Sequence, residues 1–346
     1  MNRTHSLLTV FIYIAVSLAG CSFPQPQIVE VTATPTYTET PVGATATETP
    51  LPPFPTVELG RAENPLILAL PPSADSPEQI NAAKLIASQF TERTGYSVVT
   101  VAPDSSIALV DALAAGNAHI VLLDPYAYEL AYRQDLVRAA YAVLKDGEGK
   151  YGAQFLATRR GGFTSYFDEG TQENLTEDRA VALAQFEGKK PCWSDESSPS
   201  GYVVPLGYLN ESQISTKPAA FVEGHPTVVR SLYASGICDF GATYIDARKF
   251  PSLEDEFPDL LEQVIVVWQI PAVIPYDVLA FSTRMPAGMP ELFASLVPAI
   301  MQTDAGRAAF KTAYDVDELE AVNDGYYEEF RIYVDESGVD LTTILK

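Results

Sequence analysis

Residues 197–202, with the sequence Ser-Ser-Pro-Ser-Gly-Tyr, place three serine hydroxyl groups and a glycine at the start of a predicted helix at 201–209. The N-terminus of a helix has free N–H groups and a partial positive charge, so it binds anions readily. Serine hydroxyls add donors, and a glycine lets a ligand approach the backbone. We therefore predict an oxyanion site here; a turn that only caps the helix is the alternative. The candidate ligand-binding residues of this stretch are Ser197, Ser198, Ser200, Gly201 and Tyr202.

Three residues outside this stretch are further candidates for the same site. Tyr126 follows Asp124-Pro125 at the end of a predicted strand, where open α/β sheets bind ligands, but it can equally be a packing aromatic. Ser105 opens a predicted helix, where it or Asp104 can simply serve as the N-cap. Asp246 is either a solvated surface residue or a group that accepts a hydrogen bond from a protonated or amine-bearing ligand.

The sequence carries no pattern typical of the common enzyme chemistries. It has no Ser/His/Asp triad spacing and no GxxxxGK[ST] phosphate-binding loop. His119 and His225 have no metal-ligand spacing with each other or with Cys192 and Cys238. We therefore expect a protein that is not an enzyme and that uses neither a metal nor a cofactor.

Short apolar strands alternate with helices along most of the chain, which is typical of parallel sheets covered by helices. We predict a first series of strands at 66–70, 96–101 and 119–123. We predict a second series at 190–193, 238–242 and 264–268. Another strand at 278–282 precedes helices between about 290 and 314. Two such series predict an α/β fold with two lobes.

Composition narrows the range of partners. The 346 residues carry a formal net charge of -23, which argues against nucleic acid because a phosphate backbone needs clustered Lys and Arg. The same charge argues against a polybasic membrane-binding surface. A small anion is still compatible, because screening at physiological salt limits long-range repulsion to about 8 Å.

The N-terminus resembles the signal sequence of bacterial lipoproteins. Arg3 precedes an apolar run from Leu7 to Leu18, and Ala19-Gly20-Cys21 completes a lipobox-like tetrapeptide. The run is shorter than the roughly 20 residues of a membrane-spanning helix, which is the alternative together with a chance tetrapeptide. We expect residues 1–20 to be removed and Cys21 to carry a lipid. Residues 21–60 are rich in Pro and Thr, and we expect a disordered spacer.

Two cysteines remain once Cys21 is assigned to the lipid. Outside the cytoplasm such a pair tends to be oxidised, so we expect a Cys192–Cys238 disulfide. Two unrelated buried thiols are the alternative.

Several segments resemble, in order and spacing, the phosphate/phosphite/phosphonate-binding proteins of ABC transporters. They are Asp124-Pro125-Tyr126, residues 197–202, residues 224–230 leading to Gly236–Ala242, and residues 268–271 followed by Ile274–Asp277. The resemblance implies a type II periplasmic-binding fold in which each lobe has a mostly parallel sheet. It places the first lobe at 61–157, the second at 158–267 and a return to the first at 268–346, with hinge strands near Ala157 and Trp268.

The resemblance also implies roles for the candidate residues, including Tyr126 and Asp246 as ligand contacts. Pro199 stands where the family usually has Thr or Ser, and Ser105 lies where it often has Tyr. The implied protein is a monomeric, lipid-anchored, extracytoplasmic lipoprotein that delivers a small anionic phosphorus solute to an ABC permease.

Other functions stay open at this point. The same fold can bind sulfonates, nitrate, thiamine precursors or peptides. A sensory or adhesion lipoprotein is a second alternative, and an extracellular enzyme is the weakest one.

Overall fold

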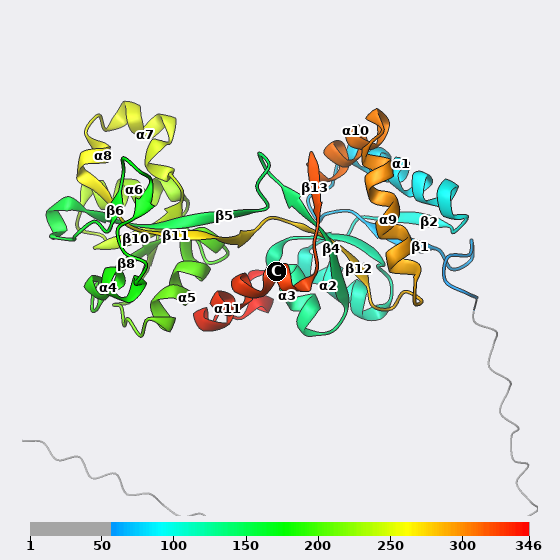
Figure 1. The fold of residues 1–346 in the computed structure, drawn as a ribbon, viewed down its shortest axis with the longest axis horizontal. Coiled ribbons are helices and arrows are strands. Elements are labelled where there is room, and N and C mark those ends of the chain that lie inside the picture. The colour runs from blue at the N-terminus through cyan, green and yellow to red at the C-terminus, as the bar shows by residue number, and fades with distance from the viewer. Residues whose placement is uncertain (1–56, 346) are drawn as a thin grey trace, which may run out of the picture. The chain divides into compact units, whose positions relative to one another are not determined.

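The structure, a computed structural model, describes residues 57–345 as two sheets with flanking helices (Figure 1). The expected signal peptide, Cys21 and the expected spacer up to residue 56 lie outside the described residues. Among residues 57–345, no helix has both the length and the apolar character that crossing a bilayer requires. We call the part built on the six-stranded sheet the first lobe and the part built on the five-stranded sheet the second lobe.

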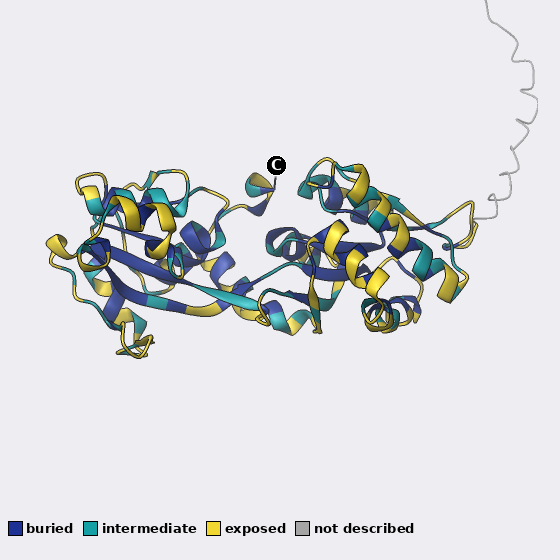
Figure 2. Ribbon diagram, turned by 90° about the horizontal axis from the view of Figure 1, so that it is seen from above, coloured by how far each residue is buried: buried dark blue, intermediate teal, exposed yellow. Residues whose placement is uncertain are grey.

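The first lobe contains a mixed sheet with the strand order β13-β4-β12-β3-β1-β2. Strand β1 pairs in parallel with β2 and β3, whereas β12 is antiparallel to β3 and β4, and β13 is antiparallel to β4. All four residues of β3 are buried, and the sheet interiors are dark blue in Figure 2. The strands are β1 (Leu66–Ala69), β2 (Val98–Val101), β3 (Ile120–Leu123), β4 (Val137–Leu144), β12 (Val278–Ser282) and β13 (Glu318–Ala321).

Helices of the first lobe begin and end where local signals in the sequence indicate. Ser76 and Gln79 form a capping box at the start of α1, and Gly95 ends the helix in a left-handed conformation. Helix α1 packs against α10 and α9. The ring centroids of Phe90 in α1 and Phe293 in α9 lie 5.2 Å apart. The helices are α1 (Pro77–Thr94), α2 (Ser106–Ala115), α3 (Pro125–Arg133), α9 (Met289–Met301) and α10 (Asp304–Tyr314).

The second lobe contains a mixed sheet with the strand order β11-β5-β10-β8-β9. Strand β10 is parallel to β8, and β8 to β9, whereas β5 is antiparallel to both β10 and β11. The strands are β5 (Lys150–Thr158), β8 (Pro191–Trp193), β9 (Ala220–Phe221), β10 (Phe240–Tyr244) and β11 (Val264–Pro275). The helices are α4 (Arg179–Leu183), α5 (Val204–Glu211), α6 (His225–Ala234), α7 (Pro251–Glu256) and α8 (Leu260–Gln263), and a small hairpin joins β6 (Phe167–Asp168) to β7 (Glu173–Asn174).

The expected two-lobed α/β fold is confirmed, but both sheets are mixed rather than mostly parallel. The chain crosses between the two sheets at residues 145–149 and 276–277, whereas hinge strands were expected near Ala157 and Trp268. Strands β5 and β11 pair with each other from Thr158 back to Lys150, so both belong to the second sheet. Strand β11 continues beyond Trp268 because a register irregularity between Ile270 and Ile274 accommodates Pro271.

The C-terminal helices α11 (Glu328–Ser337) and α12 (Leu341–Ile344) contact both lobes. On the second lobe, Tyr333 of α11 stacks on Tyr208 of α5 with ring centroids 3.9 Å apart. On the first lobe, Arg331 pairs at 2.9 Å with Glu129 of α3, whose side chain is fully buried. The Ile107 N–H then donates to the carbonyl of Leu345, just after α12. The C-terminal segment therefore passes from the first lobe to the second and back.

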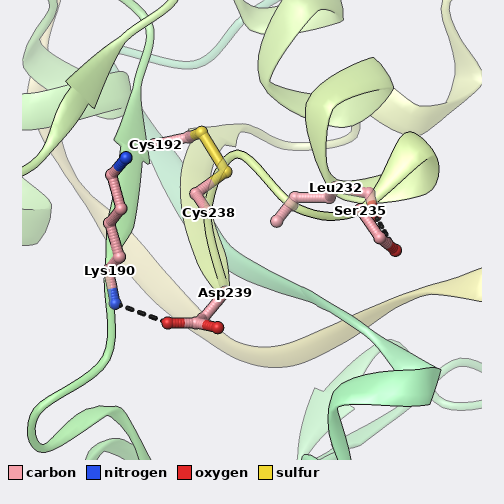
Figure 3. The surroundings of a disulfide bond; sticks show 6 residues. All are labelled: Lys190, Cys192, Leu232, Ser235, Cys238 and Asp239. Carbon is pink, nitrogen blue, oxygen red and sulfur yellow. Dashed lines mark hydrogen bonds between the residues drawn. A yellow bond between two sulfur atoms is a disulfide. The ribbon is translucent and has the colours of Figure 1, made fainter. Parts of the chain in front are cut away.

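The expected disulfide between Cys192 and Cys238 is present and joins β8 to the segment before β10 (Figure 3). Next to it, the backbone N–H of Lys190 donates to the Asp239 carboxylate at 2.8 Å. Both sulfur-bearing residues are buried in a core cluster with Val228 and Leu232 of α6. The bridge thus fixes the strand that leads directly into residues 194–202.

Reduction of this disulfide is expected to lower the free energy of unfolding of the second lobe by about 2–4 kcal/mol. The two cysteines are separated by 46 residues, and opening this loop returns conformational entropy to the unfolded chain. Urea denaturation of the protein with and without dithiothreitol measures the difference. A Cys192→Ser/Cys238→Ser variant serves as the control, because dithiothreitol must leave its transition unchanged. Identical transitions for the oxidised and reduced protein contradict a stabilising role.

Candidate functional site

Residues 197–202, which we call the serine turn, join β8 to α5. Ser198 caps a single π-helical turn, Pro199–Val203, and the α-helix begins only at Val204. The predicted helix at 201–209 is present, but the helical segment begins at Pro199 and its first turn is π-helical. The Oγ atom of Ser198 accepts the N–H of Gly201 at 2.9 Å and lies 3.4 Å from Nε2 of His225. The Ser197 hydroxyl donates to Asp195 at 2.7 Å.

Gly201 is the point where the serine turn meets its neighbours most closely. A Cβ atom at this position would lie 1.9 Å from Oγ of Ser194 and 2.9 Å from Cε1 of His225. Only a glycine fits without displacing one of these side chains. The local packing therefore brings Ser194, Ser198 and His225 around one backbone position.

Three buried polar atoms near the serine turn have no hydrogen-bond partner among the described residues: Oγ of Ser194, Nδ1 of His225 and the hydroxyl of Tyr126. Buried polar groups in folded proteins are normally paired, so an unpaired cluster calls for a ligand or bound water. The first two atoms belong to the second lobe and the third to the first lobe. Polar groups from both lobes are therefore available at this place.

Tyr126 lies in the first turn of α3, where its N–H donates to the Asp124 carboxylate at 3.0 Å. Burial, followed by the nearby Tyr151, raises the pKa of the Tyr126 phenol well above its ordinary value. Burial also raises the pKa of Tyr151 to about 12, although a hydrogen bond with Ser200 opposes the shift. Both phenols therefore stay protonated at neutral pH and can donate hydrogen bonds.

Two cavities adjoin the serine turn. The first, of about 530 Å³, is lined by Ser105 and Tyr126 of the first lobe and by Ser197 and Pro199 of the second. The second, of about 690 Å³, is lined by Ser194, Ser197, Tyr202 and C-terminal residues that include Ile344. We call them the interlobe cavity and the mouth cavity. Ser198, Ser200 and Gly201 lie beneath them in the same turn, and all three are buried.

Ser105 also has a structural role. It is the N-cap of α2, and its Oγ accepts the N–H of Ala108 at 3.2 Å. Its neighbour Ser106 donates to Asp124 at 2.9 Å. Ser105 therefore serves as the N-cap that was the alternative to a ligand contact. Its Oγ oxygen accepts a hydrogen bond from the helix, and its hydroxyl hydrogen can still be donated to a ligand in the interlobe cavity.

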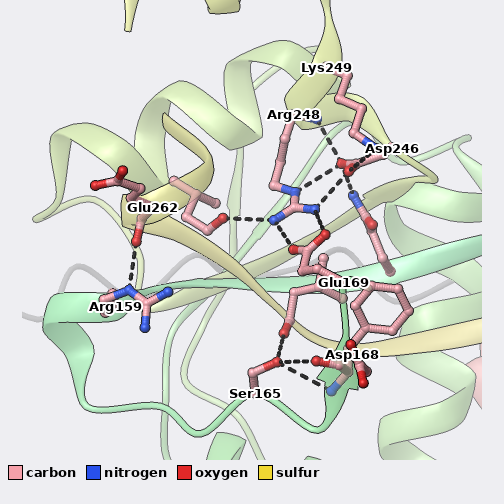
Figure 4. A network of polar contacts seen from close by, with 12 residues as sticks. Arg159, Ser165, Asp168, Glu169, Asp246, Arg248, Lys249 and Glu262 are labelled. Atoms are coloured by element: carbon pink, nitrogen blue, oxygen red, sulfur yellow. Dashed lines mark hydrogen bonds and ion pairs between the residues drawn. The ribbon is translucent and has the colours of Figure 1, made fainter. Parts of the chain in front are cut away.

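Asp246, predicted as a ligand contact, takes part in an ion-pair network of the second lobe. Its carboxylate pairs with Arg248 at 2.7 Å and accepts the Gln154 side chain at 2.8 Å (Figure 4). Arg248 is 1% exposed and also pairs with Glu169 at 2.8 Å. Asp246 lines neither the interlobe nor the mouth cavity. Nor is it the solvated surface residue of the alternative, because its side chain is 10% exposed.

Four residues of this site were not predicted from the sequence. His225 and Ser194 contact the serine turn, Asp195 accepts its hydrogen bonds, and Tyr151 pairs with Ser200. His225 was considered only as a metal ligand, although Gly224-His225-Pro226 belongs to a segment that carries the family resemblance. Burial lowers the pKa of His225, while Asp195 opposes the shift. Among the described residues no group of His, Cys, Asp and Glu side chains is arranged to hold a metal.

The Asp277→Asn substitution is expected to stabilise the protein at pH 7.5 and to change nothing at pH 4. Burial, and then the nearby Asp124, raises the pKa of Asp277 from 3.8 to about 6. The folded state therefore binds this proton more tightly than the unfolded state does. Stability consequently falls as the pH rises from about 4 to 6, by up to roughly 3 kcal/mol. Asparagine cannot ionise, so the variant does not lose this stability as the pH rises.

Urea denaturation of the Asp277→Asn variant and the parent protein at both pH values tests this expectation. The exposed Asp75 supplies the matched control, since Asp75→Asn removes one charge without relieving burial. A variant that is no more stable than its parent at pH 7.5 contradicts the assignment.

Comparisons with known proteins show the family of the chain. The family model described as "ABC transporter, phosphonate, periplasmic substrate-binding protein" matches residues 68–327. The phosphate-import protein PhnD of Mycolicibacterium smegmatis is 26% identical over 203 residues, which cover 56% of this chain and 58% of that protein. The chain therefore matches less than two thirds of that relative.

Solved structures resemble the chain at the level of the fold. The Xanthomonas citri protein XAC2383, solved with bound ATP, is 15% identical and superimposes with a TM-score of 0.56. The match covers 79% of this chain and 96% of that protein. The same protein solved with a chloride ion gives the same TM-score, 0.56.

Proposed function

Because the chain belongs to the family of periplasmic substrate-binding proteins of phosphonate ABC transporters, we propose that it captures a small phosphorus oxyanion at the serine turn for import. The family is one of binding proteins, not of enzymes. A phosphonate, phosphite or phosphate group offers several oxygen acceptors around one centre. The proposed partners of the oxyanion are the hydroxyls of Ser194 and Tyr126 and the imidazole of His225, beside the serine turn.

The single observation that carries the proposal is the set of unpaired buried atoms on Ser194, His225 and Tyr126. A polar group left unpaired in the interior costs about 1–3 kcal/mol, so three such groups beside the serine turn and the interlobe cavity favour a bound ligand. A tetrahedral oxyanion can accept from hydroxyls on both lobes. The first lobe contributes Tyr126 and the second contributes the serine turn, so one ligand would link the two.

The Tyr126→Phe substitution is expected to weaken oxyanion binding about tenfold while leaving the free protein equally or slightly more stable. It removes only a buried hydroxyl that has no partner among the described residues. Calorimetry of the chain from Ser22 onward with phosphate, phosphite and methylphosphonate measures the affinity, and urea denaturation measures the stability. Tyr96→Phe, a change outside both cavities, is the matched control.

Other ligands decide between this proposal and its alternatives. Sulfate, an alkylsulfonate and nitrate are titrated in the same buffer. Heat only with these compounds would assign the site to another oxyanion. No heat with any phosphorus oxyanion contradicts the proposal itself.

We further propose that the lobes move about the crossovers at 145–149 and 276–277 when ligand binds. Tyr276 of the second crossover stacks on Tyr151 with ring centroids 5.1 Å apart, and Tyr151 in turn pairs with Ser200. The crossover and the serine turn are thus linked through one aromatic side chain.

We also propose that Cys21 anchors the mature protein to the membrane, with residues 21–60 as a spacer, so that it can present ligand to a permease. The support is the Leu18-Ala19-Gly20-Cys21 sequence together with a family of periplasmic proteins. Membrane fractionation of cells that express the Cys21→Ser variant tests the anchor, which predicts release of the protein from the membrane fraction.

A further inference from the structure

Each of the two large sheets has two outer edges, and three of these four edges are protected against pairing with another strand. Strand β13 carries Glu318 and Glu320, and charged side chains oppose such pairing. Strand β9 is only two residues long. Strand β11 is covered by the small hairpin, since the Asn174 side chain donates to the Gln269 carbonyl at 2.8 Å. The edge of β2 has no comparable protection among the described residues.

The free edge of β2 offers both backbone groups and apolar side chains. The Val101 carbonyl accepts the N–H of Leu70, which follows β1, at 2.9 Å. Because backbone groups alternate in direction along a strand, the N–H and carbonyl of Thr100 point away from β1. Side chains alternate between the two faces, and on one face Val99 and Val101 are 41% and 47% exposed. The edge is therefore ready to pair with an extended, apolar strand.

A groove of about 540 Å³ lies beside this edge, between β2 and α1, which pack against each other (Figure 1). Helix α1 contributes Lys84, Ser88 and Glu92 to the lining of the groove. Lys84 and Glu92 are exposed, and neither carries an ion pair with another described residue. These opposite charges lie at equal separations in sequence on the two sides of Ser88.

The edge of β2 is complementary to a second copy of itself. In an antiparallel pair centred on Thr100, each Thr100 exchanges both of its backbone hydrogen bonds with its counterpart. The same register places Val99 of one copy directly opposite Val101 of the other, so the exposed valines cover one another. The Val98 N–H needs no partner across the edge, because it already donates to the Thr91 hydroxyl at 3.1 Å.

The charges on α1 fit this same arrangement. Strands β1 and β2 are parallel, so the helix that connects them runs in the opposite direction to β2. A two-fold axis at Thr100 therefore places the two α1 helices side by side and antiparallel. Thr91 contacts Val98, so the rises of helix and strand put Ser88 within about one helical turn of the level of the axis. Lys84 of each copy then faces Glu92 of the other.

We propose that the free edge of β2, together with α1, is a self-association surface through which two copies form a two-fold dimer with one continuous sheet. The dimer departs from the monomer that the family resemblance implies, and it is independent of the proposed oxyanion site. No residue of β2 or α1 lines the interlobe or the mouth cavity, so both cavities stay open. A short edge makes a small interface, and we expect dimers at about 10 µM to 1 mM.

Sedimentation velocity of the chain from Ser22 onward, between about 1 µM and 1 mM, tests the proposal. The parent protein is expected to shift from monomer to dimer over this range. The Val99→Lys/Val101→Lys variant is expected to stay monomeric, because it places like charges opposite each other across the axis. Leu175→Lys/Leu261→Lys is the matched control, since it changes two residues of the second lobe that are 65% and 47% exposed. It should dimerise like the parent.

The charge pairs on α1 provide a second, more specific test. The Lys84→Glu and Glu92→Lys variants are each expected to weaken the dimer at least about fivefold, because each converts two attractions into two repulsions. An equal mixture of these two variants is expected to dimerise again, since every facing pair then has opposite signs. The double variant Lys84→Glu/Glu92→Lys should also dimerise like the parent.

Three results would overturn the proposal. A parent protein that stays monomeric at about 1 mM excludes self-association and leaves the edge of β2 for an extended segment of another protein. A dimer that persists in Val99→Lys/Val101→Lys places the interface elsewhere on the molecule. A mixture of the two charge variants that dimerises no better than either alone excludes the antiparallel arrangement of α1. None of these results bears on oxyanion binding.

Discussion

The Asp246→Ala variant is expected to unfold with a free energy about 3–5 kcal/mol below that of the parent protein. Arg248 is 1% exposed, and Asp246 supplies its most buried partner, at 2.7 Å and 3.0 Å. Removal of the carboxylate leaves a guanidinium buried in the second lobe with only Glu169, whose side chain is 52% exposed, to balance it. An uncompensated buried charge is among the most destabilising changes a single substitution can make.

Urea denaturation at pH 7 measures the effect. The Asp304→Ala substitution is the matched control, because it also breaks an Asp–Arg pair, but one with a 97% exposed carboxylate. It should cost less than about 1 kcal/mol. An Asp246→Ala variant as stable as this control would show that the ion pair with Arg248 contributes nothing to the free energy of unfolding.

The pH dependence of the same pair of proteins provides a second measurement. Burial works against ionisation of Asp246, but Arg248 outweighs it and lowers the pKa of the carboxyl group below 3.8. A lowered pKa adds stability above the unfolded value and loses it as the pH falls through the folded value. The difference between parent and variant is therefore expected to shrink below about pH 4. Affinity for oxyanions should stay unchanged in whatever fraction remains folded.

The Gly201→Ala variant is expected to lose at least about a hundredfold in affinity for any oxyanion that the serine turn binds, equivalent to roughly 2.7 kcal/mol. The new Cβ would overlap Oγ of Ser194 at 1.9 Å and its Cβ at 2.8 Å, and it would press on His225 at 2.9 Å. Either these side chains move or the backbone of the turn does. Both outcomes misplace donors that must converge on one ligand.

Calorimetry with the ligand that the parent protein binds best measures this loss. Gly170→Ala is the matched control because Gly170 is exposed in the hairpin loop and the nearest atom to its Cβ is Asp168 Oδ1 at 3.2 Å. Stability is measured alongside, since overpacking alone costs about 1–3 kcal/mol. Unchanged affinity in Gly201→Ala would exclude the serine turn as the binding site.

Local sequence signals predicted much of the fold. The strands at 66–70, 119–123 and 278–282 all occur where expected, within one residue at each end. Strands β4 and β13 were missed, since β4 is partly exposed, β13 is mostly polar and exposed, and both are held by pairing with distant strands. The antiparallel pairs in each sheet join strands that lie far apart in the sequence. The periodicity of apolar residues within a single strand does not indicate which distant strand pairs with it.

The candidate site was also predicted only in part from the sequence. The serine turn was predicted because its residue types and its place before a helix have a local physical meaning. His225, which belongs to α6, and Tyr151, which belongs to β5, reach the serine turn only through tertiary contacts. For Asp246, the sequence alone did not indicate that its carboxylate pairs with Arg248, two residues later.

Helix α11 adds a consequence for lobe movement. The chain passes between the lobes not only at 145–149 and 276–277 but also between β13 and α11, since α11 stacks on α5 of the second lobe. Gly207 lets these helices approach so closely that a Cβ there would lie 2.2 Å from the Tyr333 carbonyl. A third connection between the lobes, separate from the two crossovers, restricts the rotation of one lobe relative to the other. Loosening the segment at 322–327 should therefore widen the range of angles between the lobes without touching the ligand.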